Sequence, residues 1–186
     1  MSREDAGWEA FEAIFHAFPM VAPPALTEFF RDPSPEVDWD PDCHLVKEAL
    51  FGKGWWLLTN EDTNELAPAF FRLCPKSWVY YLPVSVITLV LDTPAAESLE
   101  WILVLGDISQ VSRLRDEYVV LLTPEQKLAV RDALQFRYRH TLSGEGIEIS
   151  SDLEMYDTLV SLWGCQGHFT ADRWLELVDE TSLFGS

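Results

Sequence analysis

The chain has 186 residues, with 31 Asp and Glu against 13 Lys and Arg, and therefore a formal net charge of -18. Because nucleic acids and anionic membranes bind basic surfaces, this charge argues against both as partners. Apolar residues make up 48% of the chain and aromatic residues 13%, which predicts a packed protein, and the length predicts a single domain over residues 1–186.

Two amphipathic helices are expected in the first third of the chain. Apolar residues at three- and four-residue spacing predict the first over residues 4–17, ended by Pro19, with an inner face formed by Trp8, Phe11, Ile14, Phe15 and Phe18. Several prolines then predict an extended segment. Asp42 can cap a second, short helix that ends before Gly52, and its expected inner face is Leu45, Val46, Ala49 and Leu50.

The centre of the chain predicts the most deeply buried helix. Pro75 suits the first position of a helix over residues 75–91, whose sequence is apolar on nearly every side. A strand is the alternative, since Val, Ile, Thr and Tyr favour sheets. The length of the run and its internal Pro83 favour a helix that is kinked or divided at the proline.

Two more helices are expected before residue 141. The first begins at Pro94, with Leu99, Ile102, Leu103 and Leu105 facing inward. The second has the clearest start, because Thr123 can accept from the backbone N–H of Gln126 while the Gln126 side chain reaches back, which is a capping box. We expect this helix to reach about residue 140, with Leu128, Leu134 and Tyr138 inward and Arg131, Arg137 and Arg139 outward.

The C-terminal part predicts two short helices, over residues 152–163 and 171–180, after a glycine-containing loop. The expected fold class is therefore all-α, an irregular helical bundle.

Negative charge is concentrated at both ends of the chain, with a net charge of -10 over residues 1–65, zero over 66–139 and -8 over 140–186. Because chain ends often lie close together, the two ends could form one acidic face.

Five short motifs resemble those of a family of small bacterial proteins of unknown function. They are Phe51-Gly52-Lys53-Gly54-Trp55, Leu58-Thr59, Leu73-Cys74-Pro75, Tyr80-Tyr81-Leu82-Pro83 and Leu122-Thr123-Pro124-Glu125-Gln126. They are similar to a gk-x-W-x-x-L element, a P-x-x-x-x-Y-x-L-P helix and an L-T-x-x-Q helix start. The resemblance covers about residues 10–142 and implies a bacterial, helical, single-domain protein, in which residues 143–186 are an acidic helical extension. It implies no activity.

A cytoplasmic location is expected. The three cysteines are odd in number and widely spaced, which predicts reduced thiols. The charged residues that open the chain precede an amphipathic stretch, so no signal peptide is predicted. The most apolar run, residues 78–91, is shorter than the roughly 20 residues that a bilayer span needs.

A zinc site is a weak alternative that the sequence offers. Cys165 and His168 have the spacing of half a site, and Cys43, His44 and Cys74 could complete it. A second closely spaced pair is missing, and buried cysteines commonly behave as small apolar residues. We therefore expect no metal and no other cofactor. Phosphate-binding glycine loops and nucleophile elbows are also absent from the sequence, so no catalytic residue is assigned.

The charge pattern favours a non-enzymatic binding protein. An acidic face would attract and orient a basic protein, as in a bacterial immunity protein or antitoxin that blocks a toxin's substrate cleft. The predicted partner-binding residues are Asp38, Trp39, Asp40, Asp42, Glu61, Asp62, Glu65, Asp152, Glu154, Asp157, Trp174, Asp179 and Glu180. Ordinary solvated helix faces are the other explanation for these acidic residues.

The alternative function is a small helical enzyme or ligand-binding protein. Trp55, Tyr80 and Tyr81 could line an aromatic pocket in such a protein. The competing explanation is structural, because aromatic residues beside glycine often pack on a helix end and buried tyrosines are usually held by hydrogen bonds.

Overall fold

The structure of the protein is a computed structural model, which describes residues 3–31, 41–59, 62–63, 72–91, 103, 114–141 and 162–164. Within these ranges the regular elements are helical, and the one β-type contact is an isolated antiparallel bridge between Phe30 and Leu73. The all-α fold class is therefore confirmed. None of the helices in the described ranges has the length and hydropathy that a membrane span needs.

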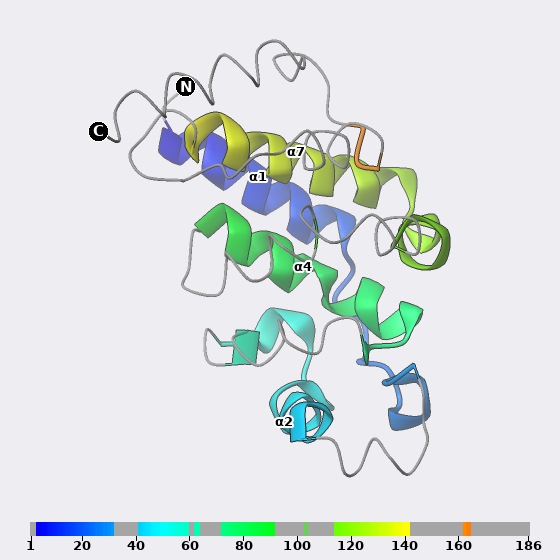
Figure 1. Cartoon of the computed structure of the whole chain (residues 1–186). Helices are drawn as coiled ribbons and strands as arrows, with labels where there is room; N and C mark the ends of the chain where they lie inside the picture. Colours follow the sequence, from blue (N-terminus) through cyan, green and yellow to red (C-terminus); the bar gives the residue numbers. More distant parts are fainter. Residues whose placement is uncertain are drawn as a thin grey trace, which may run out of the picture.

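Three long helices form the centre of the molecule (Figure 1). They are α1 (Arg3–Ala17), α4 (Pro75–Leu91) and α7 (Pro124–Thr141), and each packs against the other two. Helix α1 runs in the opposite direction to α4 and α7, and α2 (Pro41–Leu50) lies on the far side of α4. The shorter turns are η1 (Leu26–Glu28), η3 (Trp55–Leu57), the π-helical η6 (Leu114–Tyr118) and η7 (Val119–Leu121).

Helix α4 is the buried centre of this bundle, as the sequence predicted. It begins at Pro75 and ends at Leu91, and buried side chains occur on all its sides. It is not divided at Pro83, which is itself buried within the continuous helix. A proline inside a helix costs about 3 kcal/mol. The helix continues because α1, α7, η3, η6 and η7 surround it and bury the apolar residues on both sides of the proline.

Helix α7 starts with the predicted capping box but turns a different face inward. The Thr123 N–H donates to Gln126 Oε1 at 3.0 Å, and the Gln126 N–H donates to Thr123 Oγ1 at 3.2 Å. The prediction for Leu134 is confirmed, whereas Leu128 is 46% exposed and Arg137 is buried. The observed inner face is a three- and four-residue stripe with two alanines: Gln126, Ala129, Val130, Ala133, Leu134 and Arg137.

Helix α1 approaches α7 closely at Gly7, which lies against the Phe136 side chain. Gly7, Ala10 and Ile14 follow the same helical spacing, and a Cβ atom on Gly7 would lie 3.0 Å from Phe136 Cζ. Trp8 was predicted to face inward, but it is 61% exposed, stacks on Phe11 and donates its indole N–H to Glu12. A tryptophan is too large for the side of α1 that approaches α7 this closely.

Buried Arg137 closes the C-terminal end of α4. Its Nη1 donates to the carbonyl oxygen of Leu89 at 3.0 Å. Leu89 is within the last four residues of α4, whose carbonyl groups have no partner inside the helix. The guanidinium therefore supplies both a donor and a positive charge at the negative end of the helix dipole.

Helix α2 begins two residues before the start that a cap at Asp42 predicts, and its buried face differs from the expected one. It begins at Pro41, so Asp42 lies inside the helix and is not its cap. Cys43, Val46 and Leu50 are buried, whereas the predicted inward residue Leu45 is exposed. The expected left-handed turn after the helix is confirmed, because Gly52 has a φ of 76°.

A strap formed by residues 26–31 is pinned to the start of α4. The Arg31 N–H donates to the Arg72 carbonyl at 2.8 Å, and the Cys74 N–H donates to the Phe29 carbonyl at 3.0 Å. Ser77 Oγ donates to the Glu28 carbonyl at 2.7 Å, and Cys74 Sγ contacts the same oxygen. These hydrogen bonds bring residues 28–31 and 72–77, which are distant in the sequence, to the same place at the start of α4.

Two short described pieces join the core from later parts of the chain. Leu103 and Trp163 are both buried, and Trp163 Nε1 donates to the Leu103 carbonyl at 3.1 Å. Trp163 thereby ties the C-terminal part of the chain to the same apolar core as the three long helices. The helices predicted from Pro94, over residues 152–163 and over 171–180 otherwise lie outside the described residues.

Candidate functional site

The side chains that the structure describes carry no net charge in total. Its described side chains include nine acidic residues: Glu9, Glu12, Glu28, Glu48, Asp62, Asp116, Glu117, Glu125 and Asp132. They also include nine basic residues: Arg31, Lys47, Lys53, Arg72, Lys76, Arg115, Lys127, Arg131 and Arg137. The whole net charge of -18 therefore belongs to side chains outside this set. We call these described side chains the neutral scaffold.

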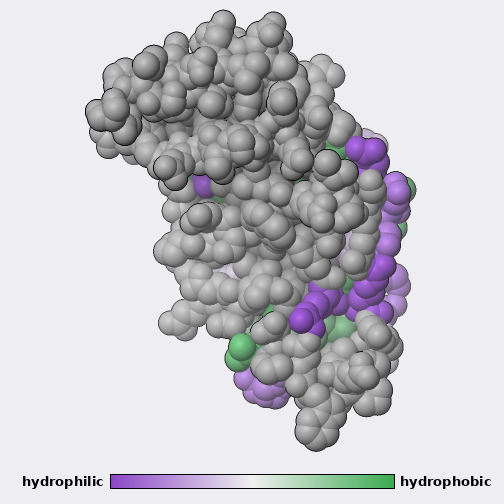
Figure 2. Space-filling view, in the orientation of Figure 1, coloured by the Kyte–Doolittle hydropathy of each residue, from purple (hydrophilic) through white to green (hydrophobic). Residues whose placement is uncertain are grey.

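Several acids of the neutral scaffold are paired within it. Glu28 lies 2.6 Å from Lys76, and Glu117 lies 2.6 Å from Arg31. Figure 2 shows hydrophilic side chains along one edge of the molecule, where the start of α4 and residues 114–121 lie. Each of these two carboxylates therefore already has a cationic neighbour within the scaffold.

Asp62 is the one predicted partner-binding residue whose side chain the structure describes. It accepts from Lys53 Nζ at 2.7 Å, from the Thr59 N–H at 2.9 Å and from Thr59 Oγ1 at 3.1 Å. Burial alone would raise the pKa of Asp62, but these hydrogen bonds outweigh it and lower the pKa below its ordinary value. Asp62 therefore holds a turn together.

The other predicted partner-binding residues are not placed by the structure. Only the backbone position of Asp42, inside α2, is described. The residues outside the described ranges are Asp38, Trp39, Asp40, Glu61, Glu65, Asp152, Glu154, Asp157, Trp174, Asp179 and Glu180.

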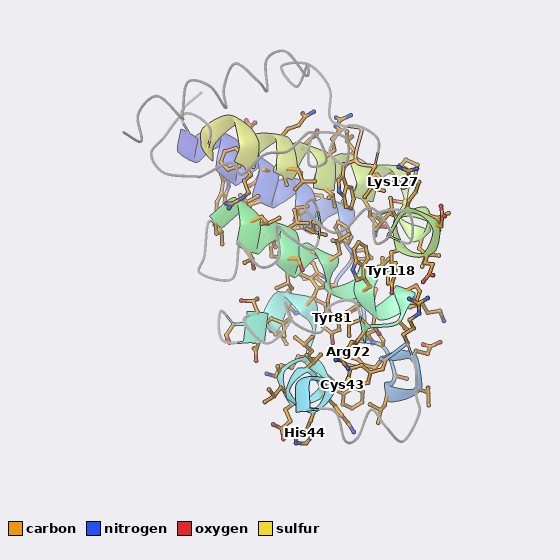
Figure 3. The ribbon with its side chains drawn as sticks, viewed as in Figure 1. Cys43, His44, Arg72, Tyr81, Tyr118 and Lys127 are labelled. Atoms are coloured by element: carbon orange, nitrogen blue, oxygen red, sulfur yellow. The ribbon has the colours of Figure 1, made fainter. Side chains whose placement is uncertain are left out.

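The three described members of the suggested zinc set do not converge. Cys43 faces the core, where Arg72 Nη1 approaches its sulfur at 3.8 Å, while His44 is exposed and lies beside Glu48 on the outside of α2 (Figure 3). Cys74 contacts the η1 strap. No group of three or more metal-ligating side chains occurs within the described ranges, and Cys165 and His168 lie outside them.

Trp55 and Tyr80 do line a pocket, as the alternative function predicted. The pocket has a volume of about 170 Å³ and lies where the end of α1, η3, α4 and the start of α7 meet. Its lining is mostly apolar and consists of Phe18, Pro19, Val21, Trp55, Lys76, Val79, Tyr80 and Gln126. Four segments that are distant in the sequence build this site.

Tyr81, the third residue predicted for the pocket, has a structural role. Its ring is fully buried between α4 and α2 (Figure 3). Its hydroxyl donates to the carbonyl oxygens of Leu50 at 2.8 Å and Lys53 at 3.2 Å, across the left-handed turn at Gly52. Tyr81 therefore fixes the end of α2 to α4.

The aromatic walls of the pocket are held by hydrogen bonds to the backbone after α1. Tyr80 Oη donates to the Val21 carbonyl at 2.8 Å, and Trp55 Nε1 lies 3.4 Å from the Pro19 carbonyl. The Phe15 and Trp55 rings pack with centroids 4.9 Å apart, which supports the tryptophan from behind. Because their polar ends are bonded to backbone, both rings are apolar where they line the pocket, and Tyr80 is half-buried whereas Trp55 is 2% exposed.

The polar groups of the pocket are two donors that sequence reasoning missed. Lys76 Nζ lies 2.6 Å from Glu28 Oε1 in an exposed ion pair. In Gln126 the amide oxygen accepts from the Thr123 N–H, which leaves the amide nitrogen as the remaining donor. The capping-box signal located Gln126 in the sequence, but nothing local to residues 123–126 indicates that a pocket lies beside it.

Burial raises the pKa of three tyrosines near α4. The pKa values of Tyr80, Tyr81 and Tyr118 all lie above the ordinary value, and loss of hydration of the phenolate is the main cause in each case. Tyr118 packs 5.2 Å from Trp78, and its buried hydroxyl has no hydrogen-bond partner among the described residues. We refer to Tyr81 and Tyr118, whose side chains are buried, as the buried tyrosines. All three tyrosines are protonated at neutral pH, so none is prepared to act as a base.

No protein-family model matches the chain, no curated protein is similar to it, and no solved structure matches its fold. The motif resemblance to a family of small bacterial proteins stays a prediction from the sequence.

Proposed function

We propose that this protein is a non-enzymatic acidic binding protein, whose partner is a basic protein. The observation that carries the proposal is the concentration of negative charge at the two ends of the chain. The net charge is -10 over residues 1–65, zero over 66–139 and -8 over 140–186. Charge used only for solubility has no reason to be concentrated in this way.

The spacing of acidic residues in the segment 32–42 supports this proposal. The segment has five acidic residues and no basic residue, and Asp38, Asp40 and Asp42 alternate along the chain. Residues two apart are separated by at most about 7 Å of extended chain. Because the Debye length is about 8 Å in physiological salt, neighbouring carboxylates of this set act together on an approaching cationic surface.

The kind of partner that fits is a protein with a basic cleft. A toxin that binds nucleic acid or another anionic substrate has such a cleft, and an immunity protein or antitoxin would block it with carboxylates. Trp39 stands between two of the acidic residues and could supply the apolar anchor that strong interfaces require. Within this proposal the scaffold supports the acidic segments and carries no catalytic group.

Two triple variants of equal charge change test the proposal. In the first, Asp38, Asp40 and Asp42 are replaced by Asn. In the control, Glu9→Gln, Glu48→Gln and Asp116→Asn remove three exposed acids of the scaffold.

Partners captured by the original protein are identified, purified and titrated against both variants over a range of salt concentrations. We expect a basic partner whose affinity falls with salt and falls more than tenfold further in the first variant, with little change in the control. A partner whose binding ignores salt, or equal losses in both variants, would contradict the proposal.

A further inference from the structure

We propose that the pocket between α1, η3, α4 and α7 binds a small aromatic carboxylate, a single six-membered ring bearing one carboxylate group. The inference is independent of the proposed acidic binding function, because it depends only on side chains of the neutral scaffold. Its support comes from the size of the pocket, the character of its walls and the kind of polar group at its rim.

The size of the pocket matches one ring. Its volume is about 170 Å³, and an apolar protein cavity of about 150 Å³ is known to accommodate benzene. A ring with a short polar substituent fits within the available space, with the substituent directed to the polar rim.

The walls favour a flat, apolar group. Tyr80 is half-buried and its hydroxyl is directed to the Val21 carbonyl, so its ring can face a ligand; Trp55 also lines the pocket, but it is 2% exposed and its indole N–H is directed to the Pro19 carbonyl. Phe18 adds a third ring to the lining. Aromatic rings gain about 0.5–1.5 kcal/mol from offset or edge contacts with another ring, beyond the burial of apolar area. An aromatic ligand therefore makes better use of these walls than an aliphatic one.

The rim favours an acceptor with negative charge. Lys76 and Gln126 offer an ammonium group and an amide nitrogen, both of which are donors. Glu28 now neutralises Lys76 at 2.6 Å, but both side chains are substantially exposed. Exposed ion pairs contribute little free energy, so a ligand carboxylate can replace Glu28 as the partner of Lys76 at small cost.

Two single variants with opposite expected effects test the proposal. Gln126→Glu preserves the capping box, since Glu at this position can accept from the Thr123 N–H as Gln does, but it removes the amide donor and adds a negative charge. Glu28→Gln releases Lys76 from its counter-ion, while the Glu28 backbone carbonyl still holds Ser77 and Cys74. Lys47→Gln on α2 is the control for the loss of a basic residue away from the pocket.

Benzoate is the probe, titrated against ¹⁵N- and methyl-labelled full-length protein, with neutral benzamide and with acetate as comparison compounds. We expect saturable shifts in the resonances of Val21, Val79 and the Trp55 indole. Benzoate affinity should fall at least tenfold in Gln126→Glu, rise threefold or more in Glu28→Gln and stay constant in Lys47→Gln, while circular dichroism confirms that all three variants fold.

Three results would overturn the proposal. They are the absence of saturable shifts at these residues, equal affinity for benzoate and benzamide, and equal effects of the Gln126 and Lys47 substitutions. Each can occur whether or not the acidic segments bind a basic protein, so the two proposals fail separately.

Discussion

Replacing Tyr81 by Phe tests whether its hydroxyl holds α2 against α4. The substitution keeps the buried ring and removes one donor that serves the carbonyl oxygens of Leu50 and Lys53. The Leu50 oxygen retains a second donor, the Lys53 N–H at 3.0 Å, so only part of its hydrogen bonding is lost. We therefore expect a loss of about 1–2 kcal/mol in the free energy of unfolding, the lower part of the range for leaving buried polar groups unsatisfied.

Tyr80→Phe is the matched control, because the two tyrosines are adjacent in α4 and lose the same atom. The Tyr80 hydroxyl donates to the Val21 carbonyl in an exposed position, where water can replace it. We expect a loss of at most about 0.5 kcal/mol for this variant.

Urea denaturation followed by circular dichroism measures both changes, provided that the dependence on denaturant concentration is the same as for the original protein. Equal losses for the two variants, or a larger loss for Tyr80→Phe, would refute the assignment of Tyr81 as the link between α2 and α4. A change in the denaturant dependence would instead show that the variant alters how much surface unfolds.

Three further predictions concern the core. Arg137→Met should lower the free energy of unfolding by about 1.5–3 kcal/mol, since it removes a charged donor from the Leu89 carbonyl at the end of α4; a thermal or urea midpoint unchanged from the original would show that the arginine is dispensable. Trp163→Phe removes the hydrogen bond to the Leu103 carbonyl and should lower the free energy of unfolding by about 1–3 kcal/mol. It should also increase amide hydrogen exchange in α4 and α7, and unaltered exchange would show that this contact does not tie the C-terminal part of the chain to the core. The buried tyrosines have higher pKa values in the folded than in the unfolded chain, so the free energy of unfolding should fall as pH rises above about 10, by up to about 1.4 kcal/mol per pH unit for each residue. Urea denaturation should therefore give a lower free energy of unfolding at pH 11 than at pH 9, and equal values would contradict this prediction.

Local signals in the sequence were sufficient for the starts of α4 and α7, although not for the start of α2. The Thr123–Gln126 capping box and the proline at the first position of α4 were both predicted correctly, because their geometry is decided within a few residues. Gly52 was predicted for the same reason. These features depend little on what packs around them.

The orientation of a helix depends on its neighbours, and there the sequence was less informative. Large apolar side chains were expected to face inward, yet Leu128 and Trp8 are exposed while Ala10, Ala129 and Arg137 are buried. The close approach of α1 and α7 selects small residues at their contact, and the open end of α4 selects a donor. The need for small residues and the need for a donor both arise only when the helices are packed together. The hydrophobicity of the side chains therefore could not reveal either need.

The candidate site was predicted in part for the same reason. Trp55 and Tyr80 were identified as aromatic residues with possible surface, and both line the pocket. Tyr81 was included only because it is adjacent in sequence, although successive residues of a helix point about 100° apart. Lys76 and Gln126 were missed because they lie on two helices that are far apart in the sequence. No local sequence pattern indicates that these two residues meet at one pocket.

The pairing of residues 29–31 with residues 72–74 has a consequence for how this protein could diversify. The polypeptide between them carries α2 and Trp55, which pack in the core, and five of the acidic residues proposed to meet a partner. Because the two ends of this segment are joined by their own hydrogen bonds, residue choices at its positions outside the core can change while the bundle keeps its contacts. Selection for a different partner would then need to preserve these two ends and the core residues between them, such as Val46, Leu50 and Trp55.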